Sequence, residues 1–140
     1  MILHITAELT NLGTIRRFVE ESALSLSADE QTAYALVHAV DEYATNIIEH
    51  GYRHRPGSIE IEIDRVDETL TIVLRDHAPP FDPTRVLPPD LTLPLEEREP
   101  GGLGLYLTRQ MIDHWQYRAL PDGGNELTLF KQIKPTQTQA

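Results

Sequence analysis

Two short runs near the middle of the chain alternate strictly between apolar and polar residues. Ile59, Ile61 and Ile63 alternate with acidic residues, and the apolar positions within 70–74 repeat the pattern after a short turn. Successive side chains of a strand point to opposite faces of a sheet, so each run places its apolar residues on one face. The pattern predicts a β-hairpin with one apolar face, which needs further strands or helices packed on it.

The flanking sequence supplies these further elements. Alternating apolar residues predict strands, and apolar residues at steps of three and four predict helices. The predicted elements are a strand over 3–9, a helix capped by Thr10 or Asn11, a helix that opens with the capping-box pair Ser27 and Glu30 and ends at Gly51, the hairpin, a helix over 103–115, and strands over 116–120 and 126–133.

The order of the elements indicates the fold class. Strands and helices do not alternate regularly, so we expect an α+β fold rather than a doubly wound sheet. Its architecture would be a two-layer α/β sandwich, in which a mostly antiparallel sheet carries helices on one face. We expect a single domain over 1–134 and a disordered polar tail over 135–140.

Composition limits the partners and the compartment of the chain. Net charge is −10, and there is no cysteine. Nucleic acids and anionic membranes are bound through Lys and Arg, so we expect no direct nucleic acid and no membrane as a partner. A chain without cysteine fits the cytoplasm. Any phosphate site must be built locally, from backbone N–H groups, a metal ion or a few basic side chains.

Three polar residues share one face of the second predicted helix. Glu42 and Asn46 are four positions apart, and His50 continues the line one turn later. A carboxylate, an amide oxygen and an imidazole in this arrangement suit a general base, a Mg²⁺ ligand and a phosphate contact. A solvated helix face is the alternative, because Asp41 and Glu49 beside them are also polar.

Asp76 has the inward parity of Leu74 at the end of the second hairpin strand. An inward carboxylate needs a hydrogen-bond donor, and an adenine amino group would serve. A nearby Arg or a backbone N–H of the following turn is an equal alternative. Seven of the ten prolines follow between Pro79 and Pro100, which predicts a functional lid or a disordered segment.

Three glycines stand at the start of the third predicted helix. Gly101, Gly102 and Gly104 let backbone N–H groups approach an anion, and a helix N-terminus adds free donors and a favourable dipole. Such a site binds phosphate without Lys or Arg. The alternative is an ordinary glycine-rich turn. No Lys-Ser/Thr pair follows the glycines, so this is not a Walker A loop.

Three segments in this order resemble the Bergerat-type ATP-binding fold of histidine-kinase-like, GyrB-like, Hsp90-like and MutL-like proteins. They are 39–52 (AVDEYATNIIEHGY), 75–83 (RDHAPPFDP) and 101–113 (GGLGLYLTRQMID). Within this fold, the chain resembles the anti-sigma-factor serine/threonine kinases of bacterial partner-switching systems.

The resemblance implies an activity, cofactors and partners. ATP would be held with Mg²⁺, and the γ-phosphate would pass to a Ser or Thr of an anti-sigma-factor antagonist. A sigma factor is a further implied partner, and a homodimer through the first strand and sheet edge is another. The alternative is a domain that sequesters its partner without catalysis, with or without ATP.

The resemblance also implies roles for single residues. Glu42 would be the catalytic base, Asn46 the Mg²⁺ ligand, and Arg16 a partner contact. The implied ATP-binding residues are Asn46, His50, Asp76, Ala78, Phe81, Gly101, Gly102, Leu103, Gly104, Leu105 and Asn125.

Three positions depart from the family pattern. Ala78 replaces a glycine two residues after the adenine Asp, and Asn125 stands where related domains often carry Thr. No basic residue immediately precedes the glycines, and Arg98 is the nearest candidate for a phosphate contact. Ala78 and the missing basic residue motivate the non-catalytic alternative, whereas Asn125 could keep a polar contact.

Overall fold

The computed structural model describes residues 1–86, 90–94, 96 and 102–133, with only the backbone of 102 and 103. Its main feature is a five-stranded antiparallel sheet with strand order β1-β2-β3-β5-β4. The strands are β1 (Ile2–Thr6), β2 (Ser58–Val66), β3 (Thr69–Asp76), β4 (His114–Ala119) and β5 (Asn125–Gln132). The expected α+β sandwich with an antiparallel sheet is confirmed.

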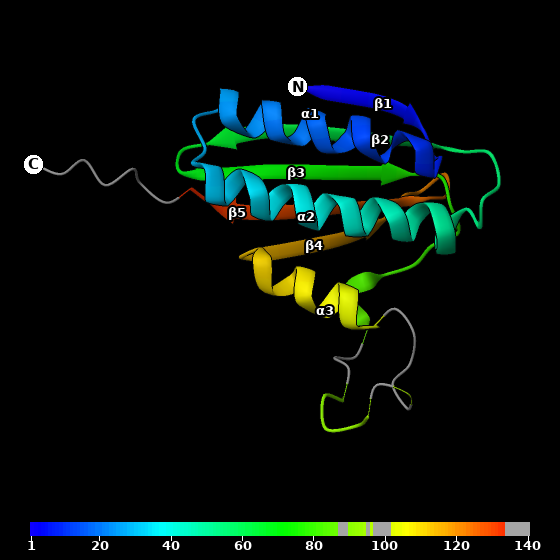
Figure 1. The fold of residues 1–140 in the computed structure, drawn as a ribbon. Helices are drawn as coiled ribbons and strands as arrows, with labels where there is room; N and C mark the ends of the chain where they lie inside the picture. The colour runs from blue at the N-terminus through cyan, green and yellow to red at the C-terminus, as the bar shows by residue number, and fades with distance from the viewer. Residues whose placement is uncertain (87–89, 95, 97–101, 134–140) are drawn as a thin grey trace, which may run out of the picture.

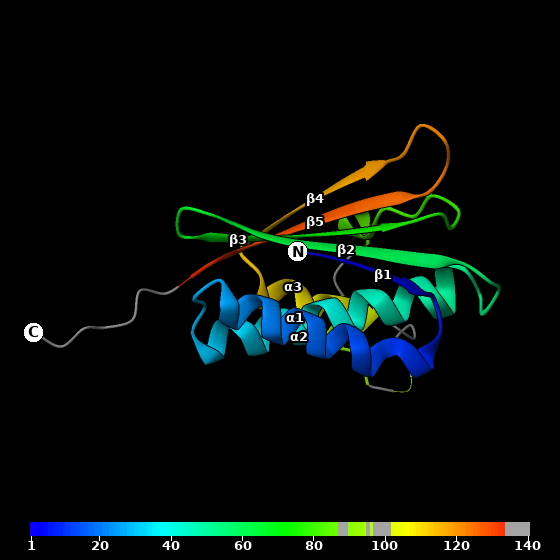
Figure 2. The same ribbon diagram turned by 90° about the horizontal axis from the view of Figure 1, so that it is seen from above.

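Three helices form the second layer: α1 (Leu12–Ser25), α2 (Glu30–Asn46) and α3 (Gly102–Met111). All three lie on the same face of the sheet (Figure 1, Figure 2), and α2 runs between α1 and α3. α2 continues as a π-helical turn over Ile47–Gly51. None of the helices in the described ranges combines the length and apolar character that a membrane crossing requires.

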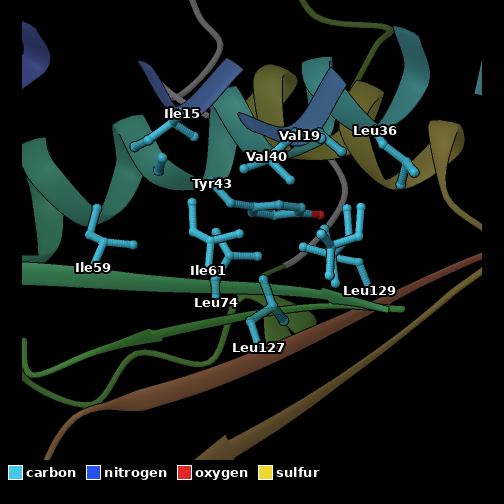
Figure 3. Packing of buried hydrophobic residues seen from close by; sticks show 14 of the residues in the cluster. Ile15, Val19, Leu36, Val40, Tyr43, Ile59, Ile61, Leu74, Leu127 and Leu129 are labelled. Carbon is cyan, nitrogen blue, oxygen red and sulfur yellow. The ribbon is translucent and has the colours of Figure 1, made fainter. Parts of the chain in front are cut away.

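The core lies between the sheet and the helices. The inward positions of the hairpin are fully buried, as its alternation predicts, with Ile61 and Ile72 both at 0 % exposure. Figure 3 shows Ile61 and Leu74 on the side of the sheet that faces Val40 and Tyr43 of α2. Burial of apolar surface is the dominant favourable contribution to folding, and the buried apolar residues gather in this layer.

One predicted helix start and one strand end differ from the structure, whereas α1 begins directly after Asn11, as predicted. Ser27 has a φ of +69°, which a helix cap does not adopt, and Asp29 caps α2 instead by accepting from the Thr32 N–H at 3.2 Å. The Asn11 side chain bonds the Thr6 carbonyl rather than its own helix. The first strand ends at Thr6, and Leu9 is 42 % exposed in a 3₁₀ turn rather than inward-facing.

The third predicted helix is too long at its C-terminal end. It ends at Met111, and Trp115 belongs to β4, where it pairs with Leu129. The Trp115 ring lies tilted against Tyr43 with 6.0 Å between centroids, and the Arg109 guanidinium lies 5.3 Å from the centre of the Trp115 ring. This packing favours the strand, although the helical apolar spacing extends through Trp115.

Candidate functional site

Glu42 on α2 meets Gly104 on α3. A Cβ atom placed on Gly104 would lie 2.2 Å from Glu42 Oε1, far inside contact distance. The carboxylate therefore rests against the backbone of the first turn of α3, in the space that a side chain at 104 would fill. The structure thus brings together the predicted base and the glycine-rich helix start.

The surroundings of Glu42 make its carboxylate more basic. Partial burial raises the pKa of Glu42, and the negative charges of Asp41 and Glu49 raise it further, while His50 lowers it. A carboxylate with a raised pKa accepts a proton more readily from a hydroxyl. This environment suits a general base better than a solvated helix face does.

Asn46 lies one helical turn after Glu42 and is partly buried. Its Nδ2 is buried and has no hydrogen-bond partner among the described residues. An unpaired buried amide is costly unless something completes its hydrogen bonds. Phosphate oxygens would accept from Nδ2, and Mg²⁺ would bind Oδ1, so the amide fits a Mg²⁺-nucleotide.

His50 stands in the π-helical turn and is exposed. The wider turn is completed by Tyr52, whose N–H donates to the Ile47 carbonyl at 2.8 Å. His50 is close enough for its charge to affect Glu42. The described residues contain no group of three or more His, Cys, Asp or Glu that could hold a metal by themselves.

Asp76 ends β3 on the inward face and is only 4 % exposed. Its Oδ1 accepts from the Ala78 N–H and from Asn125 Nδ2, both at 2.9 Å. Burial raises the pKa of Asp76, while these two hydrogen bonds oppose the shift. The backbone partner suggested by the sequence is thus present, and both bonds end on the same carboxylate oxygen.

Ala78 is 2 % exposed and packs against Gly51. A Cβ on Gly51 would lie 3.1 Å from the Ala78 methyl group. The methyl group at 78 therefore occupies room left by a glycine on the π-helical turn. Phe81, three residues later, is 55 % exposed, and its N–H donates to Asn125 Oδ1.

The remaining predicted site residues are placed as follows. Leu105 is buried in the core, and Arg16 is ion-paired with Asp41 at 2.7 Å between α1 and α2. Gly101, Arg98, the side chain of Leu103 and the tail 135–140 lie outside the described residues. The described start of the predicted lid contains a 3₁₀ turn over Pro83–Arg85.

Sequence reasoning missed two residues beside Asp76. The Tyr117 hydroxyl on β4 bonds Asn125 Oδ1 at 2.5 Å. Gly124 has a φ of +105°, and a Cβ there would lie 2.1 Å from the Asp76 carbonyl oxygen. The Gly-Gly turn was a visible signal for close approach, whereas the role of Tyr117 depends on pairing between strands.

Two related proteins match most of this chain. A serine/threonine-protein kinase, BtrW, of Bordetella bronchiseptica is 27 % identical over 95 % of this chain and 94 % of its own length. A serine-protein kinase, RsbW, of Bacillus cereus is 31 % identical over 72 % of this chain, and the match spans 64 % of that relative.

A solved structure supports the same fold. The crystal structure of the RsbU and RsbW domains of a Mycobacterium tuberculosis protein matches with a TM-score of 0.63 at 18 % identity. The match covers 100 % of this chain and 35 % of that one. Residues 5–131 match the histidine kinase-like ATPase domain. The chain therefore belongs to the histidine kinase-like ATPase domain family.

Proposed function

We propose that the protein is a serine/threonine kinase that transfers the γ-phosphate of ATP to a hydroxyl of an anti-sigma-factor antagonist. The observation that carries the proposal is the contact of Glu42 Oε1 with the backbone at Gly104. It sets a basic carboxylate beside the helix N-terminus where phosphates would bind. The kinase names of the two relatives agree with the activity.

The reaction needs little beyond positioning and charge. The oxygen of the acceptor hydroxyl forms a bond to the γ-phosphorus, and Glu42 accepts the proton of that hydroxyl. At the same time the bond between the γ-phosphorus and the oxygen of the leaving ADP breaks. Mg²⁺, when bound, would neutralise charge on the phosphate oxygens. Asn46 would hold both the ion and a phosphate oxygen, and backbone N–H groups at the start of α3 would bind the phosphates.

Asp76 would select the base. Its Oδ1 is engaged by Ala78 and Asn125, so Oδ2 is the oxygen that we assign to the adenine amino group. The amino group is a donor and a carboxylate is an acceptor, so the pair is complementary when Asp76 is ionised.

The test is transfer of labelled phosphate from ATP to the cognate antagonist. We expect transfer by the wild type, a loss of about 10²-fold or more in Glu42→Gln, and no change in Glu20→Gln, an exposed control on α1. Transfer undiminished in Glu42→Gln would remove Glu42 from the mechanism. No transfer by the wild type would overturn the kinase assignment.

The second candidate function is partner sequestration without transfer. Ala78 favours it, because its buried methyl group stands where the family has a glycine beside the base. Calorimetry with Mg²⁺ and ATP distinguishes sequestration that depends on ATP from sequestration that does not. Tight binding without transfer would indicate a nucleotide-controlled switch, and no binding would indicate a pure interaction domain.

Partner contacts form the last part of the proposal. Arg16 is half exposed at the edge between α1 and α2, where its pair with Asp41 can open to a partner such as the antagonist or a sigma factor. β1 lies at one edge of the sheet, which suits a homodimer formed by strand pairing. A binding assay of Arg16→Ala with the antagonist tests the partner contact of Arg16. Measurement of the molar mass in solution by light scattering tests the homodimer.

A further inference from the structure

The side chain of Asn125 has every hydrogen-bonding position occupied by the protein. Oδ1 accepts from the Phe81 N–H at 2.8 Å and from the Tyr117 hydroxyl at 2.5 Å. Nδ2 donates to Asp76 Oδ1 at 2.9 Å and also reaches the carbonyls of Ala78 and Pro79, at 3.3 and 3.2 Å. An amide has two donors and two lone pairs, so no capacity remains for a ligand.

The orientation of this amide follows from its partners. A backbone N–H can only donate, so the atom facing Phe81 must be the oxygen of Asn125. Tyr117 must then donate its proton to the same oxygen, because that oxygen is an acceptor only. The nitrogen is left to face Asp76. Tyr117 and Phe81 thus determine which end of the amide meets the carboxylate.

Strand pairing holds the three side chains in line. Asn125 is directly opposite Asp76 on β3 and Ala119 on β4, and Tyr117 precedes Ala119 on the same face of β4. Gly124 lets the turn approach the end of β3 without a Cβ clash. Figure 1 shows β5 between β3 and β4, so the chain of contacts crosses the sheet at one end.

We propose that Tyr117 and Asn125 are positioning residues for adenine recognition, acting through Asp76 and not by contact with the nucleotide. The inference rests on the proposed ATP binding and assigns the residues that orient its base-selecting carboxylate. Asn125 holds Oδ1 of Asp76 in place and turns Oδ2 towards the base, and Tyr117 holds Asn125. The role suggested for Asn125 by family resemblance thereby changes from a ligand contact to a positioning one.

The first experiment compares two nucleotides in calorimetry: ATP and purine riboside triphosphate, which lacks only the 6-amino group. The ratio of their affinities reports the hydrogen bond between that amino group and Asp76. We expect a wild-type ratio of about 10 or more, since hydrogen bonds to charged groups are worth about 1.5–3 kcal/mol. A ratio near 1 in the wild type would overturn the inference.

The variants test each end of the contact chain. Asn125→Asp keeps the acceptor for Phe81 and Tyr117 but places an oxygen against Asp76, and Tyr117→Phe removes one donor. We expect the ratio to fall to about 1–3 in Asn125→Asp and by about threefold in Tyr117→Phe. Tyr34→Phe, a 64 % exposed tyrosine on α2, should leave it unchanged. Equal losses for both nucleotides in the variants would show a merely structural role.

A second measurement works without any nucleotide, so it separates this inference from the proposed function. Titration of the Asp76 carboxyl by carbon-13 NMR should show a higher pKa in Asn125→Leu than in the wild type, because the amide that donates to the ionised carboxyl is removed without adding a charge. The other titratable groups whose charges reach Asp76 are His77, Tyr52 and Tyr117. An unchanged Asp76 titration would overturn the positioning role even in a protein that binds ATP.

Discussion

Gly104 determines whether Glu42 can take its place at the start of α3. In Gly104→Ala the new methyl group would lie 2.2 Å from Oε1, so the flexible carboxylate must move away. We expect phosphoryl transfer to fall by about 10–100-fold, since misplacing a catalytic group by about 1 Å costs that much. Single-turnover rates with saturating ATP measure the loss.

The control for this substitution is Gly13→Ala on α1, where the nearest atom is an Arg16 nitrogen at 3.9 Å. It should keep full activity and gain about 0.5–1 kcal/mol of helix stability. An active Gly104→Ala protein would mean that the carboxylate does not act from the position seen here.

Asp76→Asn should abolish ATP binding without weakening the fold. The new amide oxygen can still accept from Ala78 and Asn125, and its nitrogen replaces the oxygen assigned to adenine. Burial raises the pKa of Asp76, so the ionised carboxyl opposes folding above its folded-state pKa. This opposition disappears as pH falls through that pKa towards the unfolded value.

Urea unfolding therefore checks the prediction at two pH values. At pH 7 the variant should be as stable as the wild type or more stable, and at acid pH the difference should shrink. If Asp76→Asn were clearly less stable than the wild type at pH 7, the ionised carboxyl of Asp76 would not destabilise the fold, and this account would be wrong.

At the residue scale, the sequence predicts side chains whose roles follow from local periodicity. Asp76 and Asn125 share the inward parity of their strands, and the structure confirms both as buried. The contact between Glu42 and Gly104 depends on how α2 and α3 pack, and the bond from Tyr117 depends on strand order. Neither is encoded within one element, so neither could be predicted from spacing.

Burial is the main cause of the raised pKa of Glu42, and neighbouring charges in α2 and its π-helical turn adjust it further. Glu49 raises the pKa of Glu42 and His50 lowers it. Because the base must be ionised, transfer should fail at low pH as Glu42 becomes protonated. We expect Glu49→Gln to move this acid limb to lower pH and His50→Gln to move it to higher pH.

The measurement is the pH profile of single-turnover transfer, with circular dichroism at each pH to show that the protein stays folded. Shifts in opposite directions are the signature of a titrating carboxylate whose pKa responds to the charges of both residues. If the pH profile moves in neither Glu49→Gln nor His50→Gln, a group other than Glu42 is responsible for the loss of transfer at low pH.

At the element scale, the hydrophobic pattern predicts which helices and strands exist, and their ends are less well predicted. Ser27 and Glu30 have capping-box spacing, yet Asp29 caps α2 because the chain turns through a left-handed residue at 27. Trp115 fits a helical period but packs from a strand onto Tyr43. In both cases, contacts between elements decide between two locally acceptable conformations.

Across the whole molecule, one row of charges runs over the helix-free face of the sheet. His4, Glu60, Arg75, Glu126 and Arg118 are aligned by the register of the five strands. Arg75 lies at the centre and binds Glu60, Glu62 and Glu126 at 2.9–3.1 Å. These hydrogen bonds raise the pKa of Arg75 and hold it charged.

Removing the central charge should destabilise the entire fold. In Arg75→Gln three carboxylates are left without their shared cation, and we expect a loss of about 1–2 kcal/mol in the free energy of unfolding. The loss should shrink in high salt. Arg85→Gln is the control, because Arg85 is 89 % exposed with a single partner at 3.5 Å. An equal effect of both changes would contradict the network.

The charged row also helps to determine the register of the strands. A strand that slips by one residue turns its apolar side chains to water, so the alternating pattern itself forbids that error. A slip by two residues keeps the apolar side chains facing the core. It would, however, separate Glu126 from both Arg75 and Arg118. The ion pairs thus disfavour a two-residue slip of β5, which the alternation of apolar and polar residues alone does not prevent.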